Sequence, residues 1–105
     1  MIYVFDIDNT ICKTENSDYM QSVPYADRIA EINELYYSGH TVIYQTARGM
    51  GRTKNNVMES YKLFYDLTRR QLDSWGAKYH DLILGKPAGD VYIDDKGMND
   101  ARFFG

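Results

Sequence analysis

The chain divides into short apolar runs and longer stripes in which apolar residues recur at helical spacing. Residues 2–5 are apolar without alternation, which predicts a first strand that is buried on both sides. Residues 41–45 and 79–84 predict two further strands, and residues 91–93 (Val-Tyr-Ile) predict a short fourth one. The sequence therefore predicts four strands.

Two amphipathic stripes connect the first three of these strands. Apolar side chains recur at helical spacing between Pro24 and Gly39, where Pro suits the first turn of a helix and Gly suits its end. A second stripe predicts a helix that Thr53 caps and that ends near Gly76. Residues 11–23 are polar and mixed, and they predict a loop.

The order strand, helix, strand, helix, strand, strand is typical of an α/β domain with a mostly parallel sheet. We predict one domain over residues 1–105, a Rossmann-like three-layer α/β sandwich with a short sheet. Residues 98–104 predict either a short helix or an extended tail. Ligands of such sheets lie outside the carboxyl ends of the strands, so polar residues at those ends are the candidates for a site.

Composition narrows the classes of partner. The formal net charge is −3, with 12 basic and 15 acidic residues, which argues against a broad nucleic-acid-binding face. A nucleic acid is therefore possible but not favoured. The single Cys12 excludes an internal disulfide. The first apolar run is too short for a signal peptide or a membrane span, so we expect a cytoplasmic protein without a membrane partner.

Two carboxylates follow the first strand directly. Asp6 and Asp8 are spaced i, i+2 and share a side if strand geometry continues. Two carboxylates so close repel each other unless a cation or a shared proton lies with them. Hard oxygen ligands at a strand end indicate Mg²⁺. Taken alone, the pair also fits a polar strand end that leads into an Asx turn.

Polar side chains also follow the other strands. Thr46 and Arg48 follow the second strand, Lys86 follows the third, and Asp94 and Asp95 follow the fourth. Because the carboxyl ends of parallel strands meet at one edge, we expect these groups to face one crevice. Arg48 fits either a solvated loop residue or a ligand of a substrate phosphate.

The predicted set of side chains suits a phosphoryl group and a metal ion. Phosphoryl transfer needs the charge on the equatorial oxygens to be neutralised. Mg²⁺ held by Asp6 and Asp94 would supply one clamp, Lys86 a second, and the Thr46 hydroxyl would hold a remaining oxygen. A carboxylate can attack phosphorus to give an aspartyl phosphate, and a second carboxylate can protonate the leaving alcohol and later activate water.

The run Asp6-Ile7-Asp8-Asn9-Thr10 resembles the Asp-x-Asp-x-Thr signature of the haloacid-dehalogenase superfamily of phosphatases. Thr46 looks like the second motif of that family, Lys86 like its third and Ile93-Asp94-Asp95 like its fourth, in the family's order. Asn9 stands where many members have Gly, and Asn also tolerates unusual backbone angles.

The resemblance implies a role for each matched residue. Asp6 would be the nucleophile, and Asp8 would be the general acid and base. Thr46 and Lys86 would bind the phosphate, and Lys86 would also steady Asp6. The implied magnesium ligands are Asp6, Asp8, Asp94 and Asp95, and which of the last two touches the ion stays open.

The spacing of the motifs bears on the substrate. Members of the family carry cap domains after the first motif or between the second and third, and neither gap here has room for one, so the resemblance implies a capless enzyme. Water exclusion would then come from the substrate, the 11–23 loop or a neighbouring subunit. An open sheet edge also favours a homo-oligomer.

Two branches of the family are similar in the second and fourth motifs, Thr46-Ala47-Arg48-Gly49 and Ile93-Asp94-Asp95-Lys96. They are the phosphatase domains of polynucleotide kinase-phosphatases and the small phosphatases of capsule or lipopolysaccharide biosynthesis. The expected substrate is a sugar phosphate or a phosphorylated polymer end such as a polynucleotide 3′-phosphate. The acidic net charge slightly favours the smaller substrate.

Other classes of protein fit the sequence less well. A phospho-accepting receiver domain also combines carboxylates, Mg²⁺, Thr and Lys, but its motifs come in a different order. A non-catalytic phosphate- or magnesium-binding module on the same fold would not require every catalytic residue type to be present. A dehalogenase would leave Asp8 and the second Asp pair without their main task.

Overall fold

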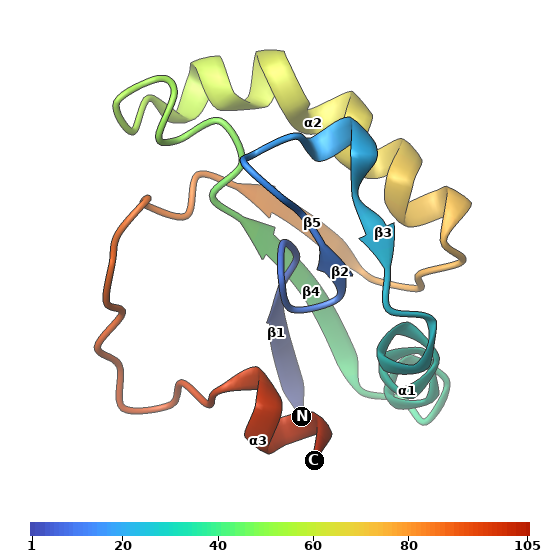
Figure 1. The fold of residues 1–105 in the computed structure, drawn as a ribbon. Coiled ribbons are helices and arrows are strands. Elements are labelled where there is room, and N and C mark those ends of the chain that lie inside the picture. The colour runs from blue at the N-terminus through green and yellow to red at the C-terminus, as the bar shows by residue number, and fades with distance from the viewer.

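The computed structural model describes all of residues 1–105. Its main sheet contains three parallel strands in the order β1 (Ile2–Asp6), β4 (Thr41–Thr46) and β5 (Asp81–Leu84) (Figure 1). Helix α1 (Ala26–Tyr37) connects β1 to β4, and helix α2 (Val57–Ser74) connects β4 to β5. The predicted α/β fold with a short parallel sheet is confirmed.

The loop between β1 and α1 contains structure of its own. Strands β2 (Cys12–Lys13) and β3 (Val23–Pro24) pair antiparallel, with the short 3₁₀ helix η1 (Tyr19–Gln21) between them. The C-terminal tail forms the short helix α3 (Asp100–Phe104). None of the helices combines the length and the apolar character that a membrane span requires.

Residues 91–93 do not form the predicted fourth strand. Tyr92 Oη donates a hydrogen bond to Pro87 O (2.6 Å) and accepts one from Gly89 N (3.0 Å). Its ring centre also lies 4.4 Å from Lys86 Nζ. These local contacts hold Tyr92 near its own loop, so the outer edge of β1 has no partner strand.

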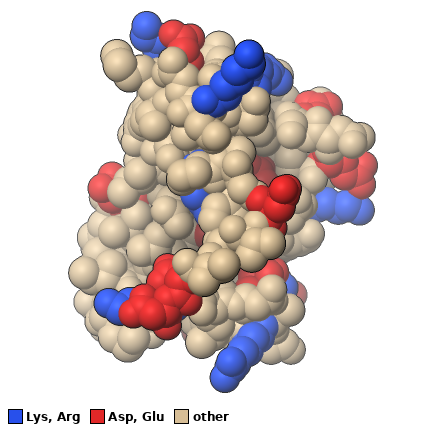
Figure 2. All heavy atoms as spheres, turned by 90° about the vertical axis from the view of Figure 1, so that its left-hand side faces the viewer, with Lys and Arg blue, Asp and Glu red and all other residues tan.

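The irregular segment 85–99 runs along one side of the molecule, the side that Figure 2 turns towards the viewer. Asp94 and Asp95 are both exposed on this segment. Acidic and basic side chains are interspersed over the face shown in Figure 2. That face therefore carries no broad basic area of the kind that nucleic-acid backbones require.

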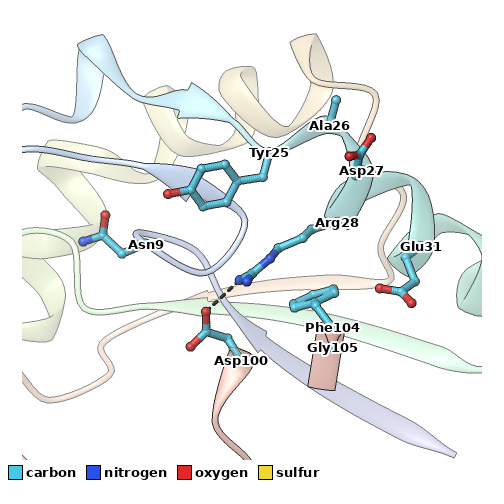
Figure 3. A pocket seen from close by; sticks show the side chains of 9 residues that line it. All are labelled: Asn9, Tyr25, Ala26, Asp27, Arg28, Glu31, Asp100, Phe104 and Gly105. Atoms are coloured by element: carbon cyan, nitrogen blue, oxygen red, sulfur yellow. Dashed lines mark hydrogen bonds and ion pairs between the residues drawn. The ribbon is translucent and has the colours of Figure 1, made fainter. Parts of the chain in front are cut away.

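Arg28 fastens the C-terminal helix to the rest of the domain. Its Nη1 donates to Asp100 Oδ2 (2.7 Å) and to Thr10 O (2.9 Å), and its Cζ lies 4.5 Å from the centre of the Phe104 ring (Figure 3). The Arg28 guanidinium holds the pKa of the Asp100 carboxyl below its ordinary value. One side chain of α1 thus joins α3 to the loop that follows β1.

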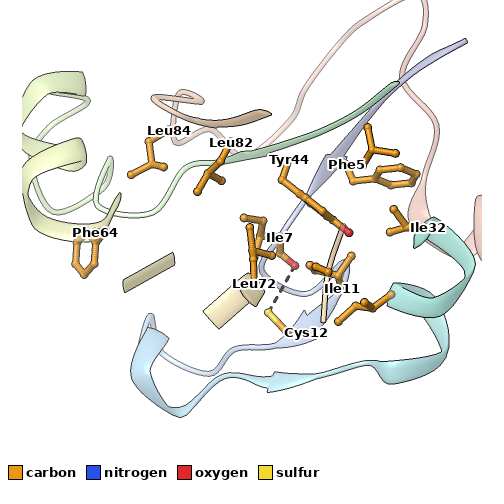
Figure 4. Packing of buried hydrophobic residues seen from close by; sticks show 13 residues of the cluster. Phe5, Ile7, Ile11, Cys12, Ile32, Tyr44, Phe64, Leu72, Leu82 and Leu84 are labelled. Carbon is orange, nitrogen blue, oxygen red and sulfur yellow. Dashed lines mark hydrogen bonds between the residues drawn. The ribbon is translucent and has the colours of Figure 1, made fainter. Parts of the chain in front are cut away.

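The hydrophobic core lies on one face of the sheet. Side chains of alternate strand residues point into this core, as the period of a strand requires. The core side chains drawn and labelled in Figure 4 include Phe5, Tyr44, Leu82 and Leu84 from the sheet, Ile32 from α1, and Phe64 and Leu72 from α2. The core is completed by three buried residues from the connection between β1 and α1, which are Ile7, Ile11 and Cys12.

The opposite face of the sheet is open, because Ile2, Val4 and Ile83 remain exposed there. The prediction that the first strand is buried on both sides is therefore wrong, since no helix covers its second face. The second helical layer of the predicted sandwich is not formed. Both crossovers advance in the same direction across the sheet, from β1 to β4 to β5, and right-handed crossovers of that kind place their helices on one face. The remaining residues, 85–105, contain only the short α3.

The predicted cap of the second helix is wrong by three residues. Asn56 is the N-cap of α2, and its side-chain oxygen accepts the Glu59 N–H at 3.1 Å. Thr53 lies one turn earlier, where its hydroxyl accepts the N–H of Asn56 (3.1 Å). Asn is a slightly better N-cap than Thr, so the helix begins at the stronger of these two capping residues.

Tyr44→Phe is expected to stabilise the fold. The Tyr44 hydroxyl is fully buried without a protein hydrogen-bond partner, and burial raises its pKa. Because an unsatisfied buried polar group costs about 1–3 kcal/mol, removing it should raise the free energy of unfolding by roughly 1 kcal/mol in urea titrations. Tyr37→Phe, at an exposed tyrosine, serves as the matched control. A less stable Tyr44→Phe protein would contradict this account of the core.

Candidate functional site

The first strand delivers two carboxylates to one edge of the sheet. Asp6 is the last residue of β1, and Ile7 turns into the core. The chain then reverses in a tight turn, in which Asn9 has φ +62° and its N–H donates to Cys12 O (2.7 Å). Asn adopts this left-handed conformation more readily than most residues. The turn leaves Asp6 and Asp8 facing the same cavity.

This cavity has a volume of about 740 Å³. Small-molecule sites usually have roughly 300–1,000 Å³, so the cavity has room for a ligand. Its lining includes Asp6, Asp8, Arg48 and Lys86, which are four of the seven predicted site residues. The structure therefore brings together side chains that follow all three strands of the sheet, as the strand-end rule predicts.

The other three predicted residues lie away from the cavity lining. Asp94 and Asp95 are exposed on the 85–99 segment, because the strand that would deliver them is not formed. Asp94 Oδ1 accepts the N–H of Lys96 (3.0 Å), and this local hydrogen bond holds the Asp94 pKa below its ordinary value. Thr46 is fully buried at the end of β4, where its hydroxyl accepts the Arg48 N–H (3.0 Å).

Lys86 reaches the cavity through a tight turn after β5. Gly85 has φ +101°, and a Cβ at this position would lie 2.9 Å from Val57 Cγ1, so only glycine fits there. The Lys86 N–H donates to Thr46 O (3.2 Å), which continues the β4–β5 pairing. Lys86 Nζ then lies 3.4 Å from Asp6 Oδ1.

Asp6 is partly shielded from water. Burial raises the pKa of its carboxyl, whereas the Lys86 ammonium and the hydrogen bond from Thr10 Oγ1 (3.1 Å) act in the opposite direction. Burial is the largest of these effects, so the Asp6 pKa is raised overall. Proton uptake by Asp6 in the folded protein thus begins at a higher pH than for a free aspartate.

Asp8 forms a two-pronged ion pair with Arg48. Arg48 Nη2 lies 2.9 Å from Asp8 Oδ1, and Arg48 Nε lies 3.0 Å from Oδ2. The hydroxyl of Thr14 also donates to Oδ1, at 2.6 Å. Arg48 is only 1% exposed, so the pair is largely removed from water and its geometry is fixed.

The remaining donors of Arg48 are also used within the protein. Arg48 Nη1 donates to Gln71 Oε1 (2.6 Å) and to Thr68 Oγ1 (3.2 Å) on α2. Cζ of Arg48 lies 4.9 Å from the centre of the Tyr19 ring, and Gln71 Nε2 donates to Tyr19 O (2.6 Å). The guanidinium that the sequence predicted as a phosphate ligand is enclosed by protein groups.

Sequence reasoning missed the partners of Arg48 because they come from distant segments. Thr14 and Tyr19 lie in the stretch that reads only as a polar loop. Gln71 is not part of any sequence motif. Thr68 offers one usable signal, since it is a hydroxyl within an otherwise apolar helical stripe and is fully buried. A buried threonine needs a hydrogen-bond partner, and here that partner is Arg48.

The donor set can be tested against the predicted magnesium ion. Asp6 and Asp8 each have a cationic partner already, Lys86 and Arg48, so the four charges balance. No group of three or more His, Cys, Asp or Glu side chains lies close enough together to hold a metal. As these residues lie, they do not form the predicted magnesium site of four carboxylates, because the predicted ligands Asp94 and Asp95 are outside the cavity lining.

Comparison with known proteins adds a fold relative. No family model matches the chain, and no curated protein matches it. A structural-genomics crystal structure from Vibrio cholerae is similar, with a TM-score of 0.88 and 27% sequence identity. The similarity covers 97% of this chain and 85% of the Vibrio cholerae chain. It supports the α/β fold over nearly the whole length.

Asp6→Asn is expected to raise the free energy of unfolding at about pH 7 and to have less effect at about pH 4. The folded state holds the Asp6 proton more tightly than the unfolded state, so ionisation above the folded pKa opposes folding. Urea unfolding in EDTA at several pH values measures this difference. Asp66→Asn, at an exposed position of α2, is the matched control. A loss of stability in Asp6→Asn at neutral pH would contradict the raised pKa.

Proposed function

We propose that this chain is a phosphomonoesterase that forms an aspartyl phosphate on Asp6, as its resemblance to the haloacid-dehalogenase phosphatases implies. The observation that carries the proposal is the shared cavity of Asp6, Asp8 and Lys86. Lys86 Nζ lies 3.4 Å from Asp6 Oδ1, close enough to neutralise a phosphate oxygen beside the nucleophile.

In the first step, a carboxylate oxygen of Asp6 attacks phosphorus, and the bond between phosphorus and the ester oxygen breaks. Asp8 has taken up a proton from solvent before this step, and the leaving alkoxide takes that proton, which returns Asp8 to the carboxylate that pairs with Arg48. Asp8 then accepts a proton from a water molecule as that water attacks the aspartyl phosphate. The bond between phosphorus and Asp6 breaks, inorganic phosphate leaves, and Asp8 has regained its proton.

Two features of the cavity suit this chemistry. Asp6 needs to be ionised to attack, and its raised pKa makes it a more basic carboxylate than a free aspartate. Lys86 carries a compact charge on a flexible stem, so it can contact Asp6 and a phosphate oxygen in turn. The predicted phosphate-binding roles of Thr46 and Arg48 have no comparable support, because both side chains are buried.

The substrate class is proposed from charge and access. The cavity is open to one side and lined by both acidic and basic groups, including Asp90 and Arg52. The chain has a net charge of −3, and the face in Figure 2 has no broad basic area. These observations favour a sugar phosphate over a polynucleotide 3′-phosphate, since a polynucleotide would need an extended basic track.

A second candidate is a binding module without turnover. Its support is the exposed position of Asp94 and Asp95, which leaves the site without the magnesium set that the resemblance implies. Such a module would hold a phosphate beside Lys86 or accept a phosphoryl group on Asp6 without releasing it. Turnover separates this candidate from the phosphatase.

Asp6→Asn is expected to abolish hydrolysis of a chromogenic aryl phosphate, because an amide oxygen is a poor nucleophile, and to reduce kcat by at least about 10³-fold. Asp66→Asn should keep wild-type activity, since Asp66 lies on an exposed surface of α2. The assay compares both variants with the wild type, first with Mg²⁺ and then with EDTA.

Each result of this assay has a distinct meaning. Turnover that survives Asp6→Asn would exclude the aspartyl phosphate. Wild-type turnover that EDTA removes would show that a metal takes part and that further ligands reach the cavity in the working enzyme. Absence of turnover on aryl phosphate, sugar phosphates and 3′-phosphorylated oligonucleotides would favour the binding module.

A further inference from the structure

We propose that Arg48 is a positioning residue that fixes Asp8 with one defined oxygen, Oδ2, available for proton transfer. This inference rests on the proposed phosphatase function. It replaces the sequence-based expectation that Arg48 binds the substrate phosphate. The same guanidinium also anchors residues 14–22, which form one wall of the cavity.

The first evidence is the complete use of the guanidinium by the protein. An arginine has five N–H donors. Arg48 Nε and Nη2 donate to Asp8, and Nη1 donates to Gln71 and Thr68. The second donor of Nη2 points to Ser22 Oγ at 3.5 Å. With no exposed side-chain surface, Arg48 could contact a phosphate only by releasing these acceptors.

The second evidence is the unequal surroundings of the two Asp8 oxygens. Oδ1 accepts from Arg48 Nη2 (2.9 Å) and from Thr14 Oγ1 (2.6 Å), and Cys12 Sγ lies 3.8 Å away. Oδ2 accepts only from Arg48 Nε (3.0 Å) as a close partner. Since each carboxylate oxygen can accept about two hydrogen bonds, Oδ2 retains a free acceptor position and Oδ1 does not.

This asymmetry assigns the proton transfers to one atom. The proton on Oδ2 moves to the alkoxide as the bond between phosphorus and the ester oxygen breaks. In the second half of the reaction, a water proton moves to Oδ2 as the water oxygen attacks phosphorus. Arg48 keeps its own protons throughout, because the guanidinium does not ionise at accessible pH.

The third evidence is the way residues 14–22 fold around the same side chain. The Tyr19 ring lies against the guanidinium, and the Thr14 and Ser22 hydroxyls lie 2.6 Å apart beside Asp8. Thr14 and Tyr19 line the cavity. Arg48 therefore supports both Asp8 and this wall, and replacing it removes no group that contacts the phosphate.

Arg48→Lys and Arg48→Gln test the proposal by steady-state kinetics on the aryl phosphate. Lysine keeps the charge but loses the planar fork that holds both Asp8 oxygens. We expect kcat to fall about 10–100-fold, while KM and the inhibition constant of inorganic phosphate stay within about twofold. Arg70→Lys, at an exposed position of α2, is the matched control and should behave as the wild type.

A double-mutant cycle with Asp8→Asn shows whether Arg48 acts through Asp8. If it does, Arg48→Gln should change kcat by less than about twofold in the Asp8→Asn background, although it changes the wild-type kcat strongly. Equal effects in both backgrounds would overturn the proposal. A rise of about tenfold or more in KM and in the phosphate inhibition constant, with kcat kept, would also overturn it and make Arg48 a substrate ligand.

Gln71→Leu provides a second test if the Arg48 variants fail to fold, as judged by circular dichroism. This change leaves Arg48 and Asp8 in place but removes one acceptor of the guanidinium and the hydrogen bond that Gln71 Nε2 donates to Tyr19 O. We expect kcat to fall severalfold with KM unchanged, and unchanged kinetics would overturn the proposal. A wild type without turnover on the aryl phosphate, sugar phosphates and 3′-phosphorylated oligonucleotides would reject the phosphatase function itself. An active wild type with an altered KM in the variants would reject only the positioning role.

Discussion

Two carboxylates that follow the first strand need two positive partners, and this requirement organises the structure. Asp6 and Asp8 lie too close together to be left without counter-charges. Lys86 approaches Asp6 from the turn after β5, and Arg48 approaches Asp8 from the loop after β4. The parallel sheet makes both contacts possible, since it places the carboxyl ends of all three strands at one edge. Segments that are 40 and 80 residues apart thereby meet in one cavity.

Sequence patterns predict well the elements whose formation depends on the spacing of apolar residues along the chain. Strand β1 and strand β4 agree with the predicted runs 2–5 and 41–45 to within one residue. Helix α1 lies within the predicted stripe before Gly39, but it begins at Ala26, and Pro24 belongs to β3 and not to the first turn of the helix. A period of two or of 3.6 residues reports which side chains can be buried on one face, and the core uses those side chains. Asp6, Asp8, Arg48 and Lys86 were predictable because strand ends in a parallel sheet converge.

The predictions that failed depend on contacts between distant segments, which a local sequence pattern does not show. The Val91-Tyr92-Ile93 run has the composition of a strand, but three residues offer few ladder hydrogen bonds, and Tyr92 instead bonds within its own loop. Asp94 and Asp95 are then left outside the cavity. The hydrogen-bond partners of Arg48 could not be predicted either, since its acceptors on α2 are 20 and 23 residues away along the chain.

The two ion pairs of the site differ in a way that suits different tasks. In the Lys86–Asp6 pair the side chains are 19% and 32% exposed, and the atoms are 3.4 Å apart. In the Arg48–Asp8 pair the arginine side chain is fully covered, and the closest contact is 2.9 Å. A partly hydrated lysine on a flexible stem can exchange one anionic partner for another at little cost. A buried, forked arginine cannot, because leaving its acceptors would strand desolvated charges. The first pair can therefore open to receive a phosphate, whereas the second keeps Asp8 in place while it does so.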